Sequence, residues 1–81
     1  MNDELSPLSK EAQTLKLGVY EHSKGKRYKV LGVGRHSETL DEMVVYQALY
    51  GGGALWVRPI GMFLDEKEIG GKKVPRFKYI G

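Results

Sequence analysis

The chain of 81 residues contains no cysteine, which excludes disulfide bridges, thiol nucleophiles and metal sites built on thiolates. Its two histidines, His22 and His36, are too few for a metal centre without carboxylate ligands. The sequence also lacks an apolar run of about 18 residues that could span a membrane, and the N-terminus MNDELSPLSK has neither the basic nor the apolar region of a signal peptide. We therefore expect a cytoplasmic protein without a cofactor or membrane contact.

The short length and the charge distribution bound the function further. A chain of this size forms one domain whose core contributes only about 3 to 5 kcal/mol, which argues against a large enclosed substrate pocket. The net charge of +3 is compatible with nucleic acid but does not require it. The segment from His22 to Ser37 contains no acid and carries five basic residues, namely Lys24, Lys26, Arg27, Lys29 and Arg35. Acids follow at once after this basic segment.

Composition divides the chain into two parts. Residues 1–16 contain no glycine and no aromatic residue, and Ser9 is placed to cap a short helix, so we expect an N-terminal arm that is helical or disordered. Residues 17–81 alternate β-branched and aromatic segments with glycine-rich turns, which is typical of a small all-β domain. The expected strands are 18–22, 27–35, 43–50, 54–59 and 76–80.

Glycines also predict how these strands are connected and bent. Gly25 lies where a turn needs a positive φ, and Gly32 and Gly34 predict a bulge or bend in the second strand. We expect residues 60–63 to form a 3₁₀-like corner with Met62 and Phe63 plugging the core, and residues 65–73 to be a charged excursion that turns at 70–71. The pattern predicts a small SH3-like barrel of about five strands.

Several motifs between residues 18 and 79 are distinctive. They are His22-x-Lys24-Gly25-x-x-Tyr28, Arg35-His36-Ser37-Glu38-Thr39, Val45-Tyr46, Ala48-Leu49-Tyr50 and Leu55-Trp56-Val57-Arg58-Pro59. By these motifs the chain resembles the bacterial family catalogued as domain of unknown function 1653. The resemblance implies an SH3-type barrel, and it implies no catalytic residues because the family has no established activity. Residues 1–16 lie outside it.

The segment GRHSETLDE, residues 34–42, contains the residue types of a catalytic site. A serine nucleophile needs a base within hydrogen-bond reach, but adjacent residues on an extended chain point to opposite sides, which separates Ser37 from His36. Local side-chain to backbone hydrogen bonds from Ser37, Thr39 and Asp41 would instead cap a loop. A glycine-rich phosphate loop is disfavoured because a strand, and not a helix, follows. A metal site from His22, His36 and Glu38 is chemically allowed but has no supporting cluster.

A binding surface agrees better with the residue types. Arginine suits carboxylates and phosphates, and aromatic rings provide stacking surfaces. The alternative is that the aromatic residues Tyr28, Tyr46, Trp56 and Phe63 form the core; Trp56 is ambiguous because Leu55 and Val57 compete for the inner face. Arg58 and Glu38 could also form a structural ion pair.

We therefore predict a non-catalytic binding module for nucleic acid or for a peptide or protein, with nucleic acid favoured by the acid-free basic segment. The predicted binding residues are Arg35, His36, Glu38, Tyr50, Trp56 and Arg58. The alternative is a small enzyme or small-molecule site with His36 and Glu38 as an acid–base pair. We expect a monomer or a weak homodimer formed through an edge strand such as the last one.

Overall fold

The structure is a computed structural model that describes residues 6–81, so residues 1–5 of the expected arm lie outside the described part. Within it the fold is mostly β with two short helices. The helices are α1 (Lys10–Thr14) and α2 (Ile60–Phe63). The strands are β1 (Gly18–His22), β2 (Arg27–Arg35), β3 (Glu42–Ala48), β4 (Leu55–Pro59), β5 (Glu66–Ile69), β6 (Lys72–Pro75) and β7 (Phe77–Tyr79). None of the helices in residues 6–81 is long and apolar enough to cross a membrane.

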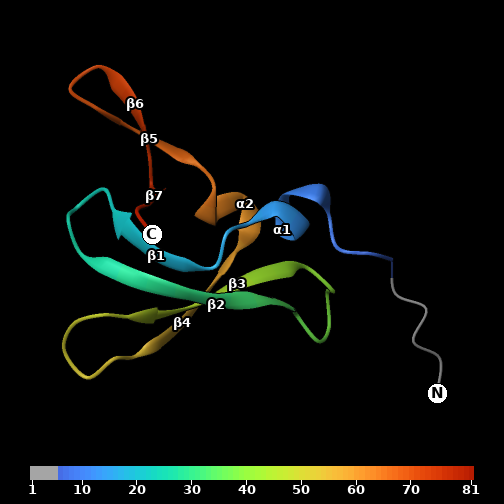
Figure 1. Ribbon diagram of the computed structural model, residues 1–81. Coiled ribbons are helices and arrows are strands. Elements are labelled where there is room, and N and C mark those ends of the chain that lie inside the picture. The colour runs from blue at the N-terminus through green and yellow to red at the C-terminus, as the bar shows by residue number, and fades with distance from the viewer. Residues whose placement is uncertain (1–5) are drawn as a thin grey trace.

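Five strands form one antiparallel sheet in the order β4-β3-β2-β1-β7, and β5 and β6 form a separate hairpin that extends away from it (Figure 1). Strands β4 and β7 are the two edges and do not pair with each other. The sheets are therefore not closed into a barrel, and the predicted SH3-like barrel is not confirmed. The expected five strands omitted β5 and β6, because the charges on both faces of this hairpin hide the alternation of apolar residues that predicts a strand.

Glycines bend the sheet at two of the places where the sequence predicts a turn or a bulge. The register between β2 and β3 shifts between Val30 and Gly32, which is the expected bulge. Gly25, with φ of 100°, lies in the β1–β2 turn, where its amide N–H donates to the carbonyl of His22 at 2.7 Å. Leu31 is the extra residue of the bulge. The apolar side chains of β2 before and after it therefore both point to the core face.

The hydrophobic core lies on one face of the main sheet. Phe63 is fully buried and stacks on Phe77 with 4.2 Å between ring centroids. Tyr46 contacts both rings edge-on. The buried cluster consists of Tyr20, Val30, Val44, Tyr46, Phe63 and Phe77, with Tyr28 packed against it. The core assignment of Tyr46 and Phe63 is confirmed, Tyr28 is only partly buried at the margin of the core, and the assignment of Met62 is wrong because this side chain is 57% exposed.

The described part of the arm is docked on the sheet through polar contacts. Ser9 caps α1 by accepting from the amide of Ala12 at 3.1 Å, and its own hydroxyl donates to the Glu42 carboxylate at 2.6 Å. These hydrogen bonds lower the pKa of Glu42. Arg35 donates to the carbonyl of Ser6, so the arm meets the sheet at the end where β2 stops and β3 begins.

Candidate binding surface

The loop between β2 and β3 uses its polar side chains to satisfy its own backbone. Nδ1 of His36 accepts from the amides of Glu38 at 3.1 Å and Thr39 at 3.3 Å. Of the three side chains predicted to cap the loop, Thr39 does so: its hydroxyl accepts from the amide of Asp41 at 3.2 Å. The hydrogen bonds among residues 6–81 include none from the side chains of Ser37 or Asp41. The side chains of His36 and Glu38 are exposed. The imidazole thus acts as an acceptor for the loop, and residues 6–81 contain no group of three His, Asp or Glu side chains that could hold a metal ion.

Two predicted binding residues of β4 point to the core face of the sheet. Trp56 lies opposite Tyr46, and Arg58 lies opposite Val44, whereas Leu55 and Val57 occupy the outer face. Arg58 donates from Nε to the Tyr46 hydroxyl at 3.2 Å, and its guanidinium lies 5.6 Å from the centre of the Phe77 ring. Arg58 therefore bonds to Tyr46 and not to Glu38.

Trp56 stays accessible although it points to the core face. Its side chain is 51% exposed because β4 is the edge strand and no further strand covers it. The tryptophan ring is thus held on a rigid strand beside a buried tyrosine, with much of its surface open to solvent.

A second group of aromatic and basic side chains lies at the other end of the same face. The hydroxyls of Tyr28 and Tyr50 are 2.6 Å apart, and the Lys26 ammonium lies 4.2 Å from the centre of the Tyr50 ring. The Tyr28 ring contacts Tyr46 edge-on at 5.3 Å between centroids, which connects this group to β4. Burial, followed by the hydrogen bond with Tyr50, raises the pKa of Tyr28 to about 12, so this phenol is neutral.

Several positively charged side chains lie near His22 on this face. Its ring lies edge-on to Phe77 at 4.9 Å, and Nδ1 accepts from the amide of Lys24 at 3.0 Å, so a neutral ring carries its proton on Nε2. Burial lowers the pKa of His22, and nearby positive charges lower it further; they belong to Lys67, Arg58, Arg76 and Lys24. The carboxylate of Asp65 is bound by Arg76 through two hydrogen bonds of 2.5 and 3.0 Å. The positive charges near His22 that have no carboxylate bound to them are therefore those of Lys67, Arg58 and Lys24.

We call these side chains the aromatic–basic surface: His22, Lys26, Tyr28, Tyr50, Trp56 and Arg58. The structure links three of the six predicted binding residues, Tyr50, Trp56 and Arg58, through the rings of Tyr28 and Tyr46. The other three lie in or beside the β2–β3 loop. Nδ1 of His36 accepts from the backbone amide of Glu38, and the side chain of Arg35 donates to the N-terminal arm.

The sequence prediction did not include His22, Lys26 and Tyr28 in the site. Two signals indicated them: the basic segment that begins at His22, and the alternation in β2 that places Tyr28 on the same face as Val30. Neither signal connects β1 and β2 to β4, which only the sheet order does.

Residues 18–79 match the family described as "Protein of unknown function (DUF1653)". The chain belongs to this family. A crystal structure of a DUF1653 protein from Bordetella bronchiseptica is similar, with 35% sequence identity and a TM-score of 0.80 over 86% of this chain and 92% of that chain. No curated protein matches the chain. The whole aromatic–basic surface lies inside the DUF1653 match, and α1 lies before it.

Proposed function

We propose that this DUF1653 protein is a non-catalytic binding module of the cytoplasm, and that its aromatic–basic surface binds single-stranded nucleic acid. The observation that carries the proposal is the half-exposed ring of Trp56 on the same positively charged face as Arg58, Tyr50 and Lys26. Proteins that bind single strands combine exposed aromatic rings, on which bases stack, with basic side chains that follow the phosphates.

The arrangement of the face suits this role in two respects. Trp56 and Tyr50 are 51% and 38% exposed, so each ring offers a surface to a base while its strand or turn holds it in place. Arg58 and Lys26 lie beside aromatic rings, where their charges are available to the phosphates that flank a stacked base. A duplex hides its base faces, so the surface should prefer a single strand.

The loop residues support the enzyme alternative poorly. A general base needs a free lone pair that faces the substrate. Because Nδ1 of His36 accepts from two backbone amides of the loop, a neutral ring carries its proton on Nε2 and has no free lone pair. We therefore assign Arg35, His36 and Glu38 to the loop and arm, and His36→Ala should leave nucleic-acid affinity unchanged.

Trp56 provides a direct test because it is the single tryptophan of the chain. Titration of an oligodeoxythymidine at low salt should quench its fluorescence, since a stacked base contacts the indole. The affinity should fall steeply as salt is added, because phosphate contacts release counterions. A duplex of the same length should bind more weakly. Quenching by a proline-rich peptide, with no response to the oligonucleotide, would replace nucleic acid by a peptide as the ligand.

A pair of neighbouring substitutions isolates the stacking contact. We expect Trp56→Ala to weaken binding of a fluorescein-labelled oligonucleotide by about 5- to 150-fold, which corresponds to one lost base–aromatic stack. Leu55→Ala is the matched control, because Leu55 is 64% exposed on the opposite face of the same strand and its loss should not change affinity. Equal anisotropy titrations for the two variants would contradict the proposed surface.

A further inference from the structure

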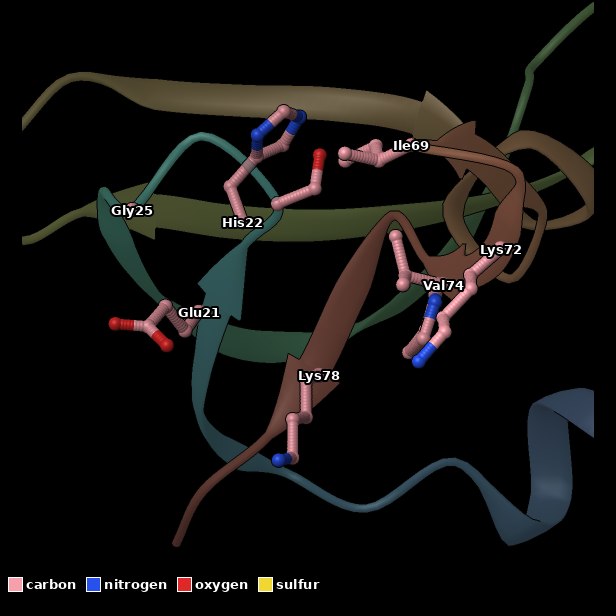
Figure 2. A pocket seen from close by; sticks show the side chains of 9 residues that line it. Glu21, His22, Gly25, Ile69, Lys72, Val74 and Lys78 are labelled. Carbon is pink, nitrogen blue, oxygen red and sulfur yellow. The ribbon is translucent and has the colours of Figure 1, made fainter.

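A cavity of about 530 Å³ lies between the β5–β6 hairpin and the turn that follows β1. Figure 2 shows Ile69, Lys72 and Val74 of the hairpin on one side, with His22 and Gly25 of the β1–β2 turn region on the other. Its volume falls within the range of about 300 to 1,000 Å³ that holds small molecules in proteins.

The cavity combines an apolar wall with positive charge. Ile69, Val74 and Pro75 supply apolar surface, and the side chains of Lys72 and Lys78 also line it. The one acid in the lining, Glu21, lies 3.6 Å from Arg27, and in Figure 2 its carboxylate points away from the hairpin. Glu21 also lies opposite Lys78 in the pairing of β1 with β7, so the charge of the lining that is left to interact with an anion is that of Lys72.

Ser23 adds a polar group with no partner inside the protein. Its side-chain oxygen is buried and makes no hydrogen bond with any of the described residues 6–81. Its amide is already engaged, donating to the carbonyl of Arg76 at 2.9 Å. The oxygen lies behind the cavity surface, so a ligand bound in the cavity does not reach it.

We propose that this cavity is a binding site for a small organic anion, in which a carboxylate or phosphate monoester is attached to a short apolar body. Lys72 binds the head group, Lys78 lies at the edge of the cavity, and Ile69, Val74 and Pro75 contact the apolar part. The site is separate from the aromatic–basic surface, with which it shares only His22. It would exist whether or not the protein binds nucleic acid.

The register of the hairpin supplies a matched pair of lysines for the test. Lys72 pairs with Ile69, and both line the cavity. Lys73 pairs with Glu68, and these two side chains point to the opposite face of the hairpin. Lys72→Gln and Lys73→Gln remove the same charge from neighbouring positions, but only the first changes the cavity.

The experiment is a titration of the ¹⁵N-labelled protein with hexanoate, hexyl phosphate and hexylammonium, followed by amide chemical shifts. We expect at least one anion to shift the amides of Ser23, Ile69 and Val74 saturably, and hexylammonium to leave them unmoved. The stronger of the two anions identifies the head group. Lys72→Gln should weaken binding by about fivefold or more, because it removes a charge-assisted hydrogen bond, and Lys73→Gln should not.

Three results would overturn the proposal: no saturable shift with either anion, equal shifts with hexylammonium, or equal weakening by both lysine substitutions. For each variant, the amide shifts of residues outside the hairpin are compared with those of the unsubstituted protein. Matching shifts show that the fold is intact. Trp56→Ala should bind the anion normally, which separates a failure of this site from a failure of the nucleic-acid proposal.

Discussion

Leu40 is the residue whose backbone departs furthest from what its side chain prefers. Among residues 6–81 it is the one non-glycine with a positive φ, at 64°, and its amide donates to the carbonyl of His36 at 2.8 Å to close the β2–β3 loop. This left-handed conformation costs a residue with a branched side chain about 1 kcal/mol or more, whereas asparagine tolerates it. The loop thus holds strain at one position.

We predict that Leu40→Asn is more stable than the matched variant Leu31→Asn by about 1 kcal/mol. The two leucines are 47% and 43% exposed, so both substitutions lose similar apolar contact and differ mainly in the backbone conformation. Urea denaturation followed by circular dichroism measures the free energy of unfolding of each. Equal midpoints for the two variants would show that the loop relaxes around Leu40 without strain.

At the scale of single elements, α2 shows how one helical turn completes the core. The amide of Leu64 donates to the carbonyl of Ile60 at 2.9 Å and closes the turn, which places Phe63 on the Phe77 ring and leaves Met62 in solvent. A helix of four residues is not stable alone. It is held because Phe63 is buried between the rings of the sheet.

We predict that Phe63→Ala lowers the free energy of unfolding by about 3 to 5 kcal/mol. A domain of this size has little more stability than that, so the variant should be largely unfolded at 25 °C. Phe63→Leu keeps part of the volume but loses the stacking on Phe77, so it should lose less stability than Phe63→Ala. Met62→Ala, at a 57% exposed neighbour, should change stability by no more than about 0.5 kcal/mol. Thermal melts of the three variants give this order, and a similar loss for Met62→Ala would contradict it.

Strand β4 is the element on which the proposed function depends, and it is also an edge. Its residues Leu55, Trp56 and Val57 are each at least half exposed, while the other edge, β7, has only three residues and carries Lys78. Short edges with lysine resist pairing with other chains. The weak homodimer expected through the last strand stays a prediction, and β4 is the better edge for it.

At the scale of the whole molecule, the main sheet and the β5–β6 hairpin are joined by the pair Asp65 and Arg76. These residues flank the hairpin, and besides their side-chain hydrogen bonds the amide of Arg76 donates to the carbonyl of Asp65 at 3.0 Å. An isolated two-stranded hairpin is marginally stable in water. The pair closes the base of the hairpin, and the amide of Ser23, which donates to the carbonyl of Arg76 at 2.9 Å, connects that base to the β1–β2 turn.

We predict that acid releases the hairpin before the main sheet unfolds. Hydrogen bonding to Arg76 lowers the pKa of Asp65 from its ordinary value of 3.8. The carboxylate therefore stabilises the folded hairpin fully above that ordinary value, and this contribution is lost as the pH falls through the lower folded-state pKa. Amide shifts of Ser23 and Arg76, recorded from pH 6 downwards, should report the change.

Asp65→Asn should remove this pH dependence and leave a separate change at Ser9, where protonation of Glu42 releases the arm; the pKa of Glu42 is also lowered. If the amides of the hairpin and of the main sheet titrate together in the unsubstituted protein, the two parts unfold as one unit and the prediction is wrong.

The sequence by itself determined what depends on neighbouring residues along the chain. The ranges of β1 and β2 agree with the prediction, because glycine turns and alternating side chains are local signals. The Ser9 cap and the loop contacts of Thr39 are local as well. Membership of DUF1653 also followed from short motifs.

Tertiary structure decided what depends on which strands meet. Barrel closure needs the two edges to pair, and the hairpin between β4 and β7 was not recognisable from its charged sequence. The sequence did not decide which face of the sheet Trp56 occupies, because its neighbours Leu55 and Val57 are apolar as well. The pairing of Trp56 with Tyr46 places it on the core face. The same register brought Arg58 to the aromatic rings while Arg35 turned to the arm. Side chains distant in sequence form one surface only through strand order and register, which the long-range pairing of the backbone sets.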